Sequence, residues 1–166
     1  MSKFFKFLLL IFVSILVATP IISVSTNFRR QTGNTCYDTA AEEARRSTTI
    51  VLINKSGTDI SLTVATLEGK WTVNCDPNLV KVIKNGTDTT FASQSDGLNA
   101  VDVVGSATYI IGNESPPVSL TITWTNPLVG SVKYNVALSS DKYIVETPLP
   151  GNGNDALYHV IVKLSN

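Results

Sequence analysis

A regular alternation of apolar and polar residues from position 48 onward is the feature that most constrains the fold of this chain. Successive side chains of a β-strand point to opposite faces, so a period of two predicts strands with one buried face. Residues 118–125 show the pattern most clearly, because four apolar side chains alternate there with serine and threonine. We expect these four to enter one core: Val118, Leu120, Ile122 and Trp124.

The same period recurs in about ten short segments separated by turn-forming residues. The connections are rich in Gly, Asn, Asp, Pro and Ser, and no helical pattern lies between the strands. Parallel neighbours need crossovers of a dozen or more residues, so these short links favour antiparallel pairing. The pattern therefore predicts an all-β fold, a single antiparallel β-sandwich over residues 48–166. The expected strands are residues 49–53, 60–65, 71–73, 79–84, 87–93, 107–111, 118–125, 133–138, 142–147 and 157–164.

The amino terminus has the parts of a secretory signal peptide. Two early lysines supply the positive region, residues 7–18 are almost wholly apolar, and a small-any-small triplet ends at Ser25. We therefore expect a signal peptide over residues 1–25 and a secreted protein. The alternative is an uncleaved membrane anchor, since residues 7–28 carry no charge and have roughly the length that crosses a bilayer. The proline and the hydroxyl residues after the apolar run favour cleavage.

Residues 26–47 differ in composition from the rest of the chain and form an expected amino-terminal arm. Thr39 and Glu42 have the spacing of a capping box, and residues 40–46 are good helix formers with acids early and bases late. A short helix is therefore expected in the arm. Two dibasic pairs are either processing sites or ordinary surface charges: Arg29-Arg30 and Arg45-Arg46.

The two cysteines of the chain, Cys36 and Cys75, predict one disulfide. An oxidising compartment allows the bond, and no metal-ligand spacing competes for the thiols. Closing a loop of about 40 residues would contribute about 4 kcal/mol by the chain-entropy estimate. The bond would attach the arm to the body of the protein.

Three triplets have the form of N-glycosylation sites, beginning at Asn54, Asn85 and Asn113. Each falls at an expected turn or strand end, where a glycan could be exposed. Pro116, directly after the third triplet, should hinder modification there.

The charge balance argues against a nucleic-acid partner. Without Lys3 and Lys6 of the signal peptide, 11 basic residues face 13 acidic ones, a formal charge of −2. Such a protein has no basic field to attract nucleic acid or an anionic bilayer. Membrane binding would therefore rest on headgroup recognition and aromatic insertion.

The sequence offers no constellation for catalysis. His159 is the only histidine and shares its strand face with apolar residues, so we expect a wall or surface position for it. Three aspartates lie in expected loops without the spacing of an acid–base pair or a calcium loop: Asp96, Asp102 and Asp141. We expect a protein that is not an enzyme and that carries no metal or cofactor.

Four ordered segments resemble the aegerolysin family, and most closely its branch of small bacterial insecticidal crystal proteins. They are Gly69-Lys70-Trp71, the sequence FASQSDG at 91–97, GSATY at 105–109 and ITWTNPLVGSVKY at 122–134. The resemblance spans residues 48–164. The chain departs from the family pattern at residues 99–104, where a glycine- and threonine-rich loop would be expected.

The resemblance implies a secreted β-sandwich that binds membrane lipids, often in sphingolipid-containing assemblies. It implies a cytolysin, or the membrane-docking component of a two-component toxin that forms pores with a larger partner protein. An extracellular adhesion or ligand-binding module without lytic activity is the alternative. Four aromatic residues in or beside the signatures are the candidate lipid contacts: Trp71, Tyr109, Trp124 and Tyr134. The strand pattern favours a core position for Trp124, whereas Trp71 fits core and interface equally well.

Overall fold

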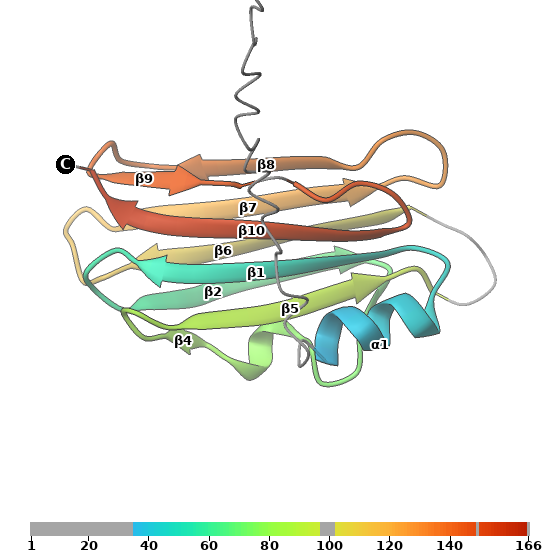
Figure 1. Ribbon diagram of the computed structural model, residues 1–166. Helices are drawn as coiled ribbons and strands as arrows, with labels where there is room; N and C mark the ends of the chain where they lie inside the picture. The colour runs from blue at the N-terminus through green and yellow to red at the C-terminus, as the bar shows by residue number, and fades with distance from the viewer. Residues whose placement is uncertain (1–34, 97–101, 149, 166) are drawn as a thin grey trace, which may run out of the picture. The chain divides into compact units, whose positions relative to one another are not determined.

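A computed structural model describes residues 35–96, 102–148 and 150–165, which form the all-β fold expected from the alternation (Figure 1). The predicted signal peptide lies outside these residues, as does the first Arg-Arg pair. The elements are α1 (Thr35–Glu43), β1 (Ser47–Lys55), β2 (Ile60–Glu68), β3 (Lys70–Trp71), the 3-10 helix η1 (Pro77–Leu79), β4 (Val82–Ile83), β5 (Asp88–Gln94), β6 (Val103–Ile111), β7 (Val118–Asn126), β8 (Lys133–Leu138), β9 (Tyr143–Glu146) and β10 (Asp155–Leu164).

The strands form two five-stranded sheets that pack face to face as a sandwich. One sheet has the order β3-β5-β1-β10-β9 and the other the order β4-β2-β6-β7-β8. All pairs are antiparallel except β1 with β10, where Ile50 lies opposite Tyr158 in parallel register. The expectation of antiparallel pairing was wrong for this pair alone. The chain passes through the whole second sheet between these two strands, so a crossover of sufficient length exists.

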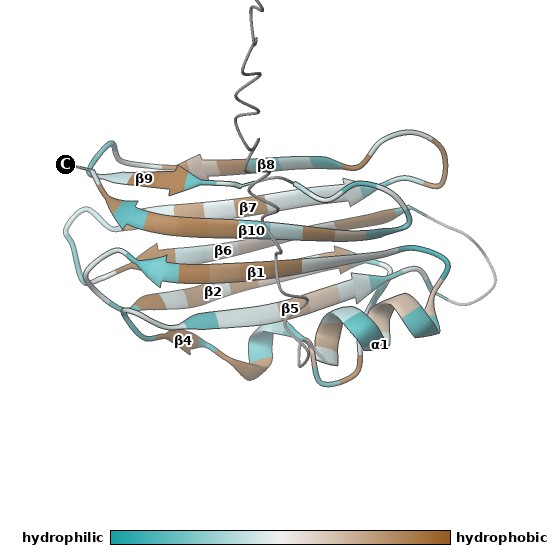
Figure 2. Cartoon of the chain, viewed as in Figure 1, coloured by the Kyte–Doolittle hydropathy of each residue, from teal (hydrophilic) through white to brown (hydrophobic). Residues whose placement is uncertain are grey.

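The register predicted for β7 is confirmed. Burial alternates along the whole strand, and the four apolar residues that alternate with serine and threonine are buried between the sheets. The threonines lie on the outer face, where the hydroxyls of Thr108 and Thr121 are 3.2 Å apart on neighbouring strands. Figure 2 shows the apolar residues that run along β1 and β10 of the opposite sheet.

Trp124 lies in the core and joins the two sheets. Its indole Nε1 donates a hydrogen bond of 2.9 Å to the hydroxyl of Ser93 on β5, and its ring lies 5.8 Å from that of Phe91. Its neighbour across the β6–β7 pair is Gly105. A Cβ atom at position 105 would lie 2.1 Å from the indole, so only glycine lets the ring occupy this position.

We predict that Gly105→Ala lowers the free energy of unfolding by about 1 to 3 kcal/mol, because the added methyl overpacks the core. The same change in a Trp124→Phe background should cost less, since the smaller ring leaves room for the methyl. Urea unfolding of the four proteins followed by circular dichroism measures both costs. Equal costs in the two backgrounds would show that the indole is not the obstacle.

Helix α1 packs on the outer face of the sheet that contains β1 and β5 (Figure 1). Cys36 and Ala40 of the helix form a small buried cluster with Cys75 and Ala92. As a result β1 is buried on both faces, and Val51, which points away from the main core, is 8% exposed. The part of the arm that the structure describes, residues 35–47, is therefore packed against the body of the protein.

The helix begins at Thr35, so the predicted start at a Thr39 capping box was wrong. Thr39 lies in the middle of the helix because the contacts of Cys36 and Ala40 with the sheet extend the helix toward its amino terminus. The Cys36–Cys75 disulfide is present, with Cα atoms 5.7 Å apart. It connects the helix to the segment between β3 and η1.

Replacing both cysteines by serine should lower the free energy of unfolding by up to about 4 kcal/mol, the chain-entropy value for a loop of this size. It should also speed amide hydrogen exchange in α1 more than in β6 or β7, because the helix loses its covalent link to the sheet edge. Denaturant titration and hydrogen exchange test the two parts. Unchanged exchange in α1 would mean that packing alone holds the helix.

Candidate functional site

The four aromatic residues predicted to contact lipid do not form one surface. Trp124 and Tyr109 are 2% and 0% exposed and belong to the core, so the prediction of lipid contact is corrected for both. The alternation that marked their strands also directs them inward. The Tyr109 hydroxyl has no hydrogen-bond partner in the part of the chain that the structure describes, and burial raises the pKa of Tyr109 well above its usual range.

Tyr134 is half-buried and has a structural role. Its ring stacks on that of Tyr158 with centroids 4.0 Å apart, and its hydroxyl donates to the carbonyl of Gly151 at 3.2 Å. Burial, with a smaller contribution from Tyr158, raises the pKa of Tyr134. Tyr134 thus ties the β9–β10 connection to β8, which leaves Trp71 as the aromatic residue of the four best placed to reach a ligand.

Trp71 lies partly in the core and partly at the surface, the two positions that the sequence left open. Its ring packs against Phe91 and Trp124, with centroids 6.4 and 6.1 Å away, yet the side chain is half-buried at the edge strand β3. Lys70 and Val73 beside it are exposed, Val73 by 57%. One side of the indole therefore belongs to the core and the other borders the surface.

We predict that Trp124→Ala lowers the free energy of unfolding by about 3 to 5 kcal/mol as a core truncation. Trp71→Ala should cost less, about 1 to 3 kcal/mol, because only part of its ring is buried. Urea unfolding measures both values. Equal losses would place Trp71 wholly in the core and remove it as a candidate contact residue.

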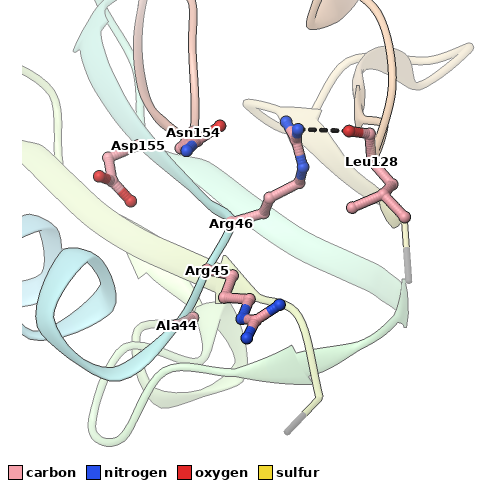
Figure 3. A pocket seen from close by; sticks show the side chains of 6 residues that line it. All are labelled: Ala44, Arg45, Arg46, Leu128, Asn154 and Asp155. Atoms are coloured by element: carbon pink, nitrogen blue, oxygen red, sulfur yellow. Dashed lines mark hydrogen bonds between the residues drawn. The ribbon is translucent and has the colours of Figure 1, made fainter. Parts of the chain in front are cut away.

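A cavity of about 450 Å³ opens at one end of the sandwich, where several connections meet (Figure 3). Arg46 crosses it and donates to the backbone carbonyl of Leu128 and, at 3.2 Å, to Oδ1 of Asn126. The buried Asn126 in turn donates to the carbonyls of Ser47 and Asn154 at 2.9 and 3.0 Å. The lining residues are Ala44, Arg45, Arg46, Leu128, Asn154 and Asp155.

The cavity carries charges of both signs. Arg45 is exposed and forms no hydrogen bond or ion pair with the residues that the structure describes, whereas Asp155 accepts a hydrogen bond of 2.9 Å from the Ser47 hydroxyl. Such a lining suits a small polar or zwitterionic group. In the sequence Arg45-Arg46 is visible only as a dibasic pair, and neither the cavity nor the role of Asn126 can be read there, because the three connections converge only in the folded chain.

Within residues 35–96, 102–148 and 150–165, no group of three or more His, Cys, Asp or Glu side chains could hold a metal ion. His159 lies on β10, outside the lining of the cavity, and partial burial lowers its pKa. Among the same residues, no helix is long and apolar enough to cross a membrane.

A second surface feature is an aliphatic edge, which we define as Val73, Leu79, Val80 and Val82. These side chains are 57%, 64%, 44% and 45% exposed. The alternation predicted short strands at 71–73 and 79–84, whereas β3 and β4 have two residues each. The signal that could have revealed the edge is the presence of large apolar residues in a segment otherwise rich in Asn, Asp, Pro and Lys.

The three predicted glycosylation sites differ in their environment. Asn54 is fully buried, and its amide donates to the carbonyls of Thr58 and Ile83 at 2.7 and 2.9 Å. Glycosylation at Asn54 is therefore incompatible with this fold, because the nitrogen that would carry the glycan faces the interior. Asn85 and Asn113 are exposed, and their modification stays a prediction.

Comparison with solved structures finds this fold in proteins of low sequence identity. RahU, solved with a Tris molecule, aligns with a TM-score of 0.60 at 16% identity, covering 74% of this chain and 97% of RahU. IP-1A from Alcaligenes faecalis aligns with a TM-score of 0.58 at 19% identity, covering 78% of this chain and 98% of IP-1A. The lipid-binding protein Nakanori aligns with a TM-score of 0.57 at 14% identity, covering 76% of this chain and 74% of Nakanori. No family model and no curated protein sequence matches the chain.

Proposed function

We propose that this chain is a secreted, aegerolysin-like protein that binds membrane lipids from outside the cell. The observation that carries the proposal is the exposure of large aliphatic side chains on a sandwich whose fold is shared with the lipid-binding protein Nakanori. A disulfide agrees with an extracellular location, since such bonds persist in oxidising compartments. The function is binding to a lipid surface, without catalysis.

The near-neutral charge supports apolar docking over attraction by bulk charge. A mature chain with a formal charge of −2 gains nothing from a distant anionic surface, so contact with the lipid itself has to supply the affinity. The finer roles implied by the family resemblance, lysis or docking for a larger pore-forming partner, are proposals beyond this first step. Both require the docking step.

A second candidate function is that of an extracellular module that binds a small polar ligand. The cavity beside Arg45 and Asp155 favours it, because charges of both signs line an open hollow (Figure 3). In this case the ligand would bind at the loop end and no vesicle would be required. Calorimetric titration with soluble zwitterions, in the absence of lipid, separates this candidate from lipid docking.

We predict that the mature protein sediments with sphingomyelin-containing zwitterionic vesicles. Binding should persist when salt rises from about 0.1 to 1 M, because screening weakens only the Coulombic part of the interaction. The measurement is the bound fraction against lipid concentration at both salt levels. Failure to bind vesicles of any lipid class, with binding of a soluble zwitterion, would favour the small-ligand module.

A further inference from the structure

The aliphatic edge differs from the scattered apolar residues found on most protein surfaces. Its four members lie within ten residues of one another, and each is at least 44% exposed. Figure 2 shows the apolar stretch that leads into β4 at the rim of the sandwich. Single exposed apolar side chains are normal, whereas several in one short segment make that segment a candidate interaction site.

The backbone beneath the aliphatic edge is held in place on several sides. Cys75, in the middle of the segment, is bonded to Cys36 of α1. Its backbone N–H donates to the carbonyl of Thr72 at 2.9 Å, and its carbonyl accepts from the N–H of Ala92 at 3.0 Å. The carboxylate of Asp76 caps η1 by accepting from the backbone of Asn78 at 2.8 Å. A surface fixed in this way loses little conformational entropy when it binds.

The segment between β3 and β4 also meets the second sheet directly. The backbone N–H of Leu62 on β2 donates to the carbonyl of Lys81 at 2.8 Å. In β4, Ile83 enters the core while Val82 points outward, and η1 contacts both β2 and β5. The aliphatic side chains therefore project from the rim where the edges of both sheets are linked.

The residue types indicate what this edge contacts. Protein interfaces are enriched in Tyr, Trp and Arg and depleted in Lys, whereas the edge consists of valine and leucine with lysines around it. Lys70 and Lys81 are exposed and form no ion pair with any residue in the described part of the chain, whereas Lys84 pairs with Asp59 at 2.7 Å. Aliphatic groups with long basic side chains beside them suit a lipid interface.

We propose that the aliphatic edge is the surface that docks on the bilayer, an inference that rests on the proposed lipid-binding function. Val73, Leu79, Val80 and Val82 enter the boundary between headgroups and acyl chains. Lys70 and Lys81 extend toward the lipid phosphates, and Trp71 lies at the interface beside Val73. Docking of this kind presents the sandwich rim to the membrane and leaves the cavity near Arg45 free of lipid contact.

The main test compares three proteins on vesicles of phosphatidylcholine and sphingomyelin. Leu79→Ser with Val80→Ser should weaken binding at least tenfold, because two aliphatic side chains no longer leave water. The matched control, Val129→Ser with Ile144→Ser, removes two aliphatic side chains that are 87% and 42% exposed elsewhere and should bind as the unaltered protein does. Thermal unfolding checks that all three remain folded.

Two further readouts keep the proposal testable if the double variant is unstable. Lys81→Gln should reduce binding about fivefold on vesicles containing phosphatidylserine and by less on zwitterionic vesicles, where the choline group offsets the charge of the phosphate. Nitroxide-labelled lipid should quench the fluorescence of Trp71, since the other tryptophan, Trp124, is 2% exposed. Equal weakening of both double variants, or no quenching on bound vesicles, would overturn this docking surface.

The outcomes distinguish failure of the proposed docking surface from failure of the proposed lipid-binding function. If the unaltered protein binds vesicles and the Leu79→Ser/Val80→Ser variant binds equally well, the aliphatic edge is not the docking surface and lipid binding stands. If the unaltered protein binds no vesicle of any composition, both the surface and the proposed function are refuted.

Discussion

The packing of Trp124 against Gly105 is the interaction on which the rest of the structure depends. The indole fills the space between the sheets, and its hydrogen bond to Ser93 satisfies the one polar atom of a ring buried at 2% exposure. A buried donor without a partner would cost more than the bond contributes, so the hydroxyl on β5 is as necessary as the glycine on β6. Phe91 and Trp71 complete the cluster and carry its packing to the sandwich edge.

The disulfide connects the edge of the sandwich, at Cys75, to α1, a helix that is not part of the alternating strand pattern. Through Cys36, α1 covers β1 on the side away from the main core, which makes β1 a strand with two buried faces. Through Cys75, the same bond fixes the irregular segment between β3 and β4. A segment this short and poor in regular backbone pairing would otherwise have little to keep Leu79 and Val80 turned toward solvent.

The two surface features have different chemistry and separate physical uses. At the loop end, Arg46 donates hydrogen bonds to the Asn126 side chain and to a backbone carbonyl, and Asn126 donates to two more carbonyls, so their role is to hold the connections around a polar cavity. At the aliphatic edge the side chains form no hydrogen bonds, and each exposes 44% to 64% of its surface to solvent. Water is a poor environment for aliphatic surface, so the edge gains free energy by leaving water and the loop end does not.

The sequence alone determined the fold class, the register of β7 and the cysteine pairing. Each follows from local spacing: a period of two selects one buried face, and two cysteines leave one bond to form. The parallel β1–β10 pair, the early start of α1 and the burial of Asn54 were decided by tertiary structure, because they depend on segments far apart in the chain. The same holds for the site. The sequence left the position of Trp71 open, and only the packing of its ring on Phe91, with the exposed Val73 two residues on, shows which side of it faces outward.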